Sequence, residues 1–276
     1  MKTKILALGI VLSVLAIGCN RDDDNNAVSV PMTQSDVKAN SEMDNISDDV
    51  LQITESQSNE SISGRGAEPG FLGPCGGNIT TTVEGNTWIR TIDFGATNCI
   101  LWNGNRVRGK IILTFTNDFA NDTRTIAYAF DNFYHNDRHV EGNRTVVKRI
   151  LENGHPQATI SLALTVTVPN GTVLTRNGER IREFTDGYDT WLNLSDNVFA
   201  YTGSWTTSNS TTGITHTATV NSPVIVKWNC LHWIVSGTVT YNRSSDNATA
   251  ILDYGDGACD DEATVTINGI VFPFTF

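Results

Sequence analysis

The chain lacks the short motifs that mark the common enzyme classes. It has no Gly-x-Ser-x-Gly elbow and no glycine-rich phosphate loop, and none of its five cysteines stands in the setting of a nucleophile. Basic residues form no stripe and do not alternate with aromatics, which argues against nucleic acid as a partner. No spacing selects a carboxylate pair for glycoside hydrolysis. We therefore expect a protein that is not an enzyme.

Long hydrophobic runs are also scarce. The apolar run at 5–17 follows Lys2 and Lys4 and is too short for a permanent membrane helix. A charged start, an apolar middle and a small residue before the cut are the layout of a signal peptide. The end of the run, Leu15-Ala16-Ile17-Gly18-Cys19, resembles the bacterial lipobox, although Ala16 stands where leucine is usual. The sequence predicts a signal peptide at 1–18, with a secretory signal cut nearby as the alternative.

The expected first residue of the mature chain is a lipid-modified Cys19, whose acyl chains would bind outer-membrane lipid. An acidic cluster, Asp22 to Asp24, follows it directly. This cluster resembles the export signal of surface-exposed lipoproteins in Bacteroidota, which predicts an outer-membrane protein facing the cell exterior. The alternative is that these aspartates only begin a solvated tether and the protein faces the periplasm.

Aromatic residues are absent from 20–70, where eleven acidic residues stand against three basic ones. A segment of this composition buries too little apolar surface to offset its chain entropy. The sequence therefore predicts a disordered acidic tether over 19–70, with at most a transient helical turn at 50–53. A flexible chain of this length would hold the folded part about 40 Å from the lipid on average.

From Phe71 onward nearly every segment alternates between apolar and polar residues. The runs 111–116, 159–168 and 234–241 are rich in Thr, Val and Ile with a period of two, which is typical of half-buried strands. Turn dipeptides such as Asn-Gly and Asn-Asp separate them. The pattern predicts one all-β domain over 71–276, an antiparallel meander of long strands that forms a sandwich or a barrel-like domain. The only marginal helix candidate after the signal peptide is 143–153.

Glycines recur near every thirty residues beside these runs, a spacing that fits a long hairpin of two strands. A glycine-rich β-protein also produces such a series by chance, so both interpretations remain open. The members of the series are Gly109, Gly142, Gly171, Gly203, Gly237 and Gly269.

A stronger repeat links the two ends of the domain. The segments 93–99 and 253–259 share Asp, an aromatic residue, Gly and Cys at identical positions, and each follows another cysteine at a comparable distance. In an oxidising compartment, four cysteines beyond Cys19 imply two disulfides with three possible connectivities. The repeat selects Cys75–Cys99 and Cys230–Cys259. Each loop would contribute roughly 3–4 kcal/mol in the ideal case.

Three segments carry a likeness of pattern over most of 75–276. The runs 107–112, 130–134 with 140–145, and 253–260 look like a group of uncharacterised Bacteroidota surface lipoproteins. That group has no established activity or catalytic residues. The resemblance implies the envelope compartment and the β-architecture, and nothing about chemistry.

Two clusters contain residues that ligate metals. The loop around Asp253, Asp256, Asp260 and Asp261 is rich in carboxylates, which suits Ca²⁺, but it lacks EF-hand spacing. Its repeat partner keeps only Asp93, which favours a structural aspartate that holds a turn through backbone hydrogen bonds. His135 and His139 would face a zinc ion together on a helix, yet their neighbours read as a hairpin. We expect no cofactor, with Ca²⁺ as the alternative.

Six tryptophans stand among many Asn and Thr residues, a mixture that stacks on sugars and hydrogen-bonds them. Tryptophans in a β-core need no ligand, so this interpretation depends on their exposure. We predict a non-catalytic binding or structural β-domain in the cell envelope, whose partner is an extracellular glycan or protein. Its alternatives are a glycan-binding surface lipoprotein and a calcium-stabilised adhesin-like module. The residues predicted to contact a ligand are Trp88, Trp102, Trp191 and Trp205.

Overall fold

A computed structural model describes residues 32–58, 72, 75–116, 123–190, 193–230, 234–260 and 262–274. Cys19 and the predicted signal peptide lie outside these residues. The described part contains one long α-helix, a single turn of 3-10 helix (η2, Leu194–Asp196) and sixteen strands of one sheet. The long helix is α1 (Gln34–Ser58). The strands are β1 (Asn78–Glu84), β2 (Thr87–Asp93), β3 (Cys99–Ile100), β4 (Arg106–Thr116), β5 (Thr123–His135), β6 (Arg138–Glu141), β7 (Asn143–Ile150), β8 (Pro156–Ser161), β9 (Leu164–Thr167), β10 (Val173–Asp186), β11 (Val198–Asn209), β12 (Thr215–Lys227), β13 (Ile234–Arg243), β14 (Thr249–Asp256), β15 (Ala263–Ile267) and β16 (Ile270–Phe274).

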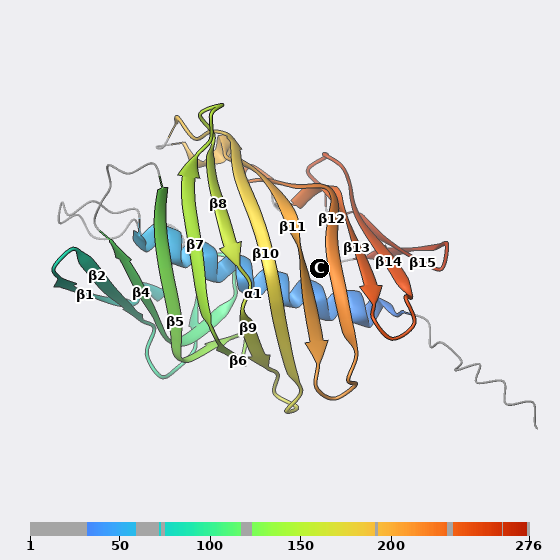
Figure 1. The fold of residues 1–276 in the computed structure, drawn as a ribbon, viewed down its shortest axis with the longest axis horizontal. Helices are drawn as coiled ribbons and strands as arrows, with labels where there is room; N and C mark the ends of the chain where they lie inside the picture. Colours follow the sequence, from blue (N-terminus) through green and yellow to red (C-terminus); the bar gives the residue numbers. More distant parts are fainter. Residues whose placement is uncertain are drawn as a thin grey trace, which may run out of the picture. The chain divides into compact units, whose positions relative to one another are not determined.

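The predicted all-β antiparallel meander is confirmed. Every strand pair between described residues is antiparallel, and from β10 to β16 each strand pairs with the next one along the chain (Figure 1). The β5–β6 hairpin turns through Asn136 and Asp137, both with positive φ, as a two-residue hairpin turn requires. The marginal helix candidate at 143–153 is wrong, because its first eight residues form β7 between β5 and β8.

The disordered-tether prediction is wrong for 32–58, because most of this segment is helix α1 and is packed against the sheet. Thirteen of its twenty-five residues are buried. Figure 1 shows α1 running across the strands on one face of the sheet. We call that face the helix-covered face and the opposite one the open face. The remaining tether residues, 19–31 and 59–70, lie outside the described part.

Local chemistry explains where α1 begins. The Thr33 hydroxyl accepts a hydrogen bond from the Asp36 amide, and the Asp36 carboxylate accepts one from the Thr33 amide at 2.9 Å. This reciprocal pair is a capping box, which satisfies amide groups that have no partner within the helix. Apolar residues then recur at helical spacing and are buried; they are Met43, Ile46, Val50 and Ile53. Both signals are present in the sequence.

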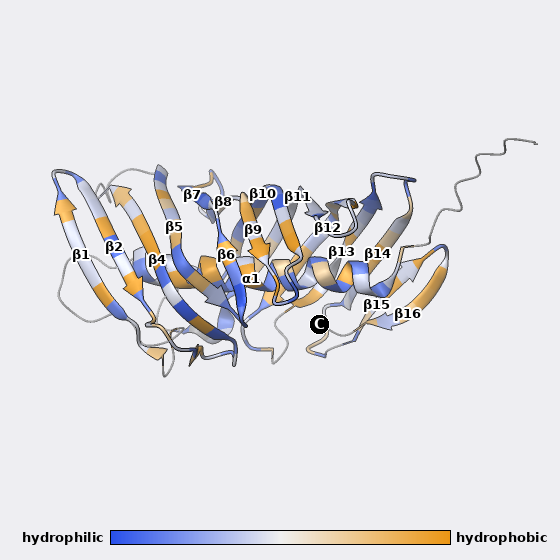
Figure 2. Cartoon of the chain, turned by 90° about the horizontal axis from the view of Figure 1, so that it is seen from below, coloured by the Kyte–Doolittle hydropathy of each residue, from blue (hydrophilic) through white to orange (hydrophobic). Residues whose placement is uncertain are grey.

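The core lies between α1 and the sheet. Aliphatic residues of the helix pack with alternate residues of the strands, such as Ile111 and Leu113 of β4. Figure 2 shows the corresponding mixture of apolar and polar positions along the strands. In the described part of the chain, no helix combines the length and hydropathy needed to cross a membrane.

Two glycines of the recurring series mark places where the sheet bends. Gly109 in β4 has a φ of +86°, and an added Cβ would lie 2.0 Å from the Asn132 carbonyl oxygen. Gly203 in β11 has a φ of +132°, and an added Cβ would lie 2.3 Å from the Glu179 backbone carbonyl oxygen. The strand register shifts at both positions. Glycine is required there because only it combines this backbone conformation with so close an approach.

Candidate functional site

Arginines from β10 meet the acidic residues of α1 on the helix-covered face. The Arg180 guanidinium lies 2.8 Å from the Asp48 carboxylate and 3.9 Å from that of Asp44, and Arg176 pairs with Asp44. The Arg176 side chain is fully buried and also donates to the Asn40 carbonyl at 2.9 Å. Asp44 and Asp48 lie one helical turn apart, so the same side of α1 presents both carboxylates to β10.

Glu55 forms a second ionic cluster, nearer the C-terminal end of α1. Its carboxylate lies 3.1 Å from the Lys148 ammonium of β7 and also pairs with Arg182 of β10. Burial raises the pKa of Glu55, but Arg182 and Lys148 lower it more, and the net direction is downward. Burial lowers the pKa of Lys148, an effect that Glu55 partly opposes. The cluster therefore depends on an ionised Glu55.

Asp48 differs from Glu55 in the direction of its pKa. Burial raises the pKa of Asp48 above its ordinary value, although Arg180 opposes this effect. The nearby carboxylates of Asp44 and Asp49 raise it further. An ion pair with Arg180 thus does not fully offset the removal of the Asp48 carboxylate from water.

Asp49 joins α1 to the loop between β3 and β4 and to the last residue of β5. Its carboxylate lies 2.7 Å from His135 Nε2 and accepts hydrogen bonds from Asn103 at 2.7 Å and Asn105 at 2.6 Å. Both Asp49 and His135 are buried. His135 is therefore a partner of α1, and it does not form a metal pair with His139, which lies beside Glu141 and stacks on Tyr134.

The C-terminal end of α1 also meets arginines. Arg90 of β2 donates to the Gln57 carbonyl, and Arg124 of β5 donates to the Ser58 carbonyl at 2.6 Å. The last carbonyls of a helix lack partners within the helix and carry a partial negative charge. These arginines therefore stabilise the helix end as well as its position.

Aromatic rings line the helix-covered face between the arginines. The Arg180 Cζ lies 4.7 Å from the Tyr201 ring centre, and the Arg182 Cζ lies 4.7 Å from that of Phe199. Arg176 lies 5.4 Å from the Trp205 ring centre. Such cation–π contacts are strongest where water is excluded. The face consequently combines positive charge with apolar surface.

The tryptophans predicted to form a ligand site do not gather in one place. Trp88 and Trp205 are buried on the helix-covered face, at 7% and 3% exposure, and contribute to the core. Trp102 is 73% exposed in the loop between β3 and β4. Trp191 lies outside the described residues. The described residues among these four therefore do not form one aromatic surface patch.

Sequence reasoning missed the arginines of β10. Arg176, Arg180 and Arg182 occupy alternate positions of one strand, on the side where neighbouring strands carry buried apolar residues. Three positive charges at core positions of a period-two pattern were the available signal. A lone strand does not say where the compensating carboxylates are, because Asp44 precedes Arg176 by 132 residues.

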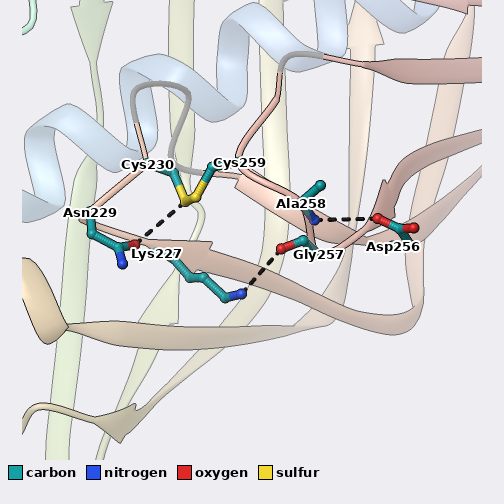
Figure 3. Close-up of a disulfide and its surroundings, with 7 residues drawn as sticks. All are labelled: Lys227, Asn229, Cys230, Asp256, Gly257, Ala258 and Cys259. Atoms are coloured by element: carbon teal, nitrogen blue, oxygen red, sulfur yellow. Dashed lines mark hydrogen bonds between the residues drawn. A yellow bond between two sulfur atoms is a disulfide. The ribbon is translucent and has the colours of Figure 1, made fainter.

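The predicted repeat and both predicted disulfides are confirmed. Cys75 pairs with Cys99 and Cys230 with Cys259, each with a Cα–Cα distance of 5.1 Å. The repeated aspartates make the same contact: Asp93 accepts from the Gly95 amide at 2.9 Å and Asp253 from the Gly255 amide at 3.0 Å. Figure 3 shows the second disulfide, with Lys227 donating to the Gly257 carbonyl beside it.

The carboxylates of the proposed calcium loop hold local turns. Asp256 accepts from the Ala258 amide and Asp260 from the Glu262 amide, as Asp253 does from Gly255. Asp261 is not among the described residues. Within the described part of the chain, no group of three or more His, Cys, Asp or Glu side chains is placed to hold a metal ion. The structural interpretation of Asp253 therefore agrees with its contacts.

Removing a disulfide is expected to destabilise the domain. Replacing Cys230 and Cys259 together with alanine frees a loop that spans 29 residues. We expect the free energy of unfolding in urea to fall by about 3 kcal/mol, because the unfolded chain gains conformational entropy. The Cys19→Ser variant serves as the control and should unfold as the parent does. A loss below about 1 kcal/mol in the double variant would contradict the prediction.

The open face of the sheet is neutral and rich in hydroxyl groups. Its threonines pair across strands, as Thr206 does with Thr217 and Thr219 with Thr240. A depression of about 290 Å³ lies over β4, β5 and β7, where Ala127 and Ala129 have small side chains. The depression is lined by Ile112, Thr114, Ala127, Tyr128, Ala129, Asn143, Arg144 and Thr145.

Comparison of the chain with protein-family models, with curated proteins and with solved structures finds no match in any of the three.

Proposed function

We propose that this chain is a lipid-anchored protein of the outer membrane that faces the cell exterior and carries a non-catalytic binding domain. The charged start, apolar run and Gly18-Cys19 support the anchor. Fourteen residues, 20–33, separate Cys19 from α1. Even fully extended, a chain of that length reaches at most about 50 Å, so an anchor at Cys19 would keep the domain close to the membrane surface.

The use of ionisable side chains supports a non-catalytic role. Asp44, Asp48 and Glu55 pair with cations of the sheet, and Asp49 pairs with His135. General acid–base catalysis requires such groups within reach of a substrate. Here all four carboxylates belong to α1, and their pairs hold the helix on the sheet.

The hydroxyl-rich open face supports a neutral glycan as the ligand, and this is the observation on which the binding role depends. Threonine, serine and asparagine side chains offer both donors and acceptors, and β11, β12 and β13 contain no acidic residue. The depression over β4, β5 and β7 is the concave part of that face. A sugar ring placed there would contact Ala127 and Ala129 and hydrogen-bond Asn143 or Thr145.

The anchor is tested by metabolic labelling of cells that express the full chain. The parent should incorporate radiolabelled palmitate and lose its domain when intact cells are treated with protease. The Cys19→Ser variant should take up no label and leave the membrane fraction, because it has no thiol to carry the acyl chains that anchor the protein. Label in both forms, or protection of the parent from protease, would contradict the anchor or the exterior location respectively.

The binding role is tested on an array of neutral and acidic glycans with the Cys19→Ser chain. We expect binding to neutral glycans, and a loss of at least tenfold in the Ala129→Phe variant, because the added ring fills the depression. The matched control is Ala200→Phe on β11, which adds the same ring to the open face away from the depression. Absence of glycan binding, or equal loss in both variants at unchanged melting temperature, would reject the role.

A further inference from the structure

One buried cation beneath α1 has no ion pair with the described residues. Asp44 and Asp48 lie with Arg144, Arg176 and Arg180, and their ion pairs are with Arg176 and Arg180. Arg144 is therefore left without an ion-pair partner among the described residues. A buried charge is ordinarily paired, because its removal from water costs several kcal/mol.

The side chain of Arg144, on β7, makes one hydrogen bond with the described residues. The residue is 1% exposed, and its Nε donates to the Ser161 carbonyl at 3.0 Å. Its two terminal nitrogens, Nη1 and Nη2, are buried and have no hydrogen-bond partner among the described residues. The carboxylate nearest in charge effect, Asp48, is bound to Arg180. A guanidinium offers these two N–H groups side by side, in the arrangement that binds an anion.

Further donors surround this guanidinium. Tyr128 of β5 faces Arg144 across the strand pair, and its ring centre lies 5.5 Å from the Arg144 Cζ. The Tyr128 hydroxyl and the Arg180 Nε are also buried without a partner among the described residues. Burial lowers the pKa of Arg144, as expected for a cation in a site of low polarity. An arginine nevertheless stays protonated in proteins, so its charge persists.

We propose that the interior of the domain holds a compact inorganic anion, bound by the terminal nitrogens of Arg144 and by the Tyr128 hydroxyl. The anion supplies the negative charge that α1 does not. Its class is a halide or small oxyanion, because the enclosure of Arg144 by α1 and the sheet excludes a bulky organic acid. Tyr128 and Arg144 are also among the residues that line the depression, but their side chains are buried, and the anion site does not depend on glycan binding.

The test is the melting temperature of the full Cys19→Ser chain at constant ionic strength. Chloride, or in a second arm phosphate, replaces gluconate, which is too bulky for the site. Above the dissociation constant, we expect the melting temperature to rise linearly with the logarithm of the free anion concentration, by roughly 5 °C for a hundredfold increase. The rise should vanish in Arg144→Met and persist in Arg149→Met. The second substitution removes an exposed arginine of β7 whose guanidinium donates hydrogen bonds to the Gln157 side chain. No rise in the parent chain, or equal behaviour of the two variants, would overturn the proposal.

A second measurement covers the case in which Arg144→Met does not fold. Crystals of the parent chain soaked in sodium bromide should give an anomalous peak within hydrogen-bond distance of the Arg144 guanidinium. Bromide stands in for chloride there. Peaks confined to the protein surface would overturn the site, whatever the variant does.

Discussion

Replacing Glu55 with glutamine is expected to lower the free energy of unfolding by about 3 to 5 kcal/mol. The substitution keeps the shape of the side chain but leaves Lys148 and Arg182, whose side chains are 23% and 12% exposed, without the carboxylate that pairs with both. Removing one partner of a buried ion pair costs this much because the remaining charge stays desolvated. Urea unfolding followed by circular dichroism measures the loss.

The control for Glu55 is Glu183→Gln. Glu183 pairs with His155 at 2.6 Å, but both side chains are more than 20% exposed. A pair of this kind contributes less than about 1 kcal/mol, because water screens it. Similar losses in the two variants would show that the ion pairs of Glu55, between α1 and the sheet, stabilise the fold no more than the exposed pair of Glu183 and His155 does.

The same substitution should change how stability responds to acid. The pKa of Glu55 is lower in the folded chain than its ordinary 4.5, so its contribution is complete above pH 4.5 and is lost as the pH falls through the folded value. The raised pKa of Asp48 acts in the opposite direction, since the folded state then binds that proton more tightly than the unfolded state. Glu55→Gln should therefore show a smaller loss of stability below pH 4.5 than the parent.

The second large effect is expected at Gly109. A Gly109→Ala side chain would lie 2.0 Å from the Asn132 carbonyl oxygen, at a φ of +86°. Backbone strain and overpacking each cost about 1 to 3 kcal/mol, so we expect a combined loss of about 3 to 5 kcal/mol. Thermal and urea unfolding measure this loss directly.

Gly104→Ala provides a matched control for Gly109. Gly104 has the same φ of +86°, but no described atom lies within 4 Å of an added Cβ. The loss there should reflect backbone strain alone, about 1 to 2 kcal/mol. If the two alanine variants lose equal stability, the bend of β4 tolerates the close approach and the argument for Gly109 is wrong.

The repeat shows how far local patterns reach. Asp93 and Asp253 were expected to hold turns, and both accept a hydrogen bond from the glycine two residues later. The disulfide partners followed from the same alignment of Cys99 with Cys259. Such contacts are predictable because aspartate turns and cysteine spacing depend on a few neighbouring residues.

The candidate site was less predictable. Tryptophans suggested a surface that binds sugar, whereas Trp88 and Trp205 are buried. Exposure depends on which face of a strand the rest of the chain covers, and a period-two pattern identifies two faces without saying which is covered. The hydroxyl-rich open face follows from the same alternation, once the helix shows which side is inside.

The amino-acid sequence by itself determined the strands, their turns, the antiparallel meander and the two disulfides, because alternation and turn chemistry act over a few residues. The tertiary structure alone decided that 34–58 is buried against the sheet. This segment was too acidic to be expected in a core, and Arg176, Arg180 and Arg182 of β10 neutralise its carboxylates there. Neither half identifies its partner, because the groups that compensate each other lie far apart in the sequence, by 132 residues for Asp44 and Arg176.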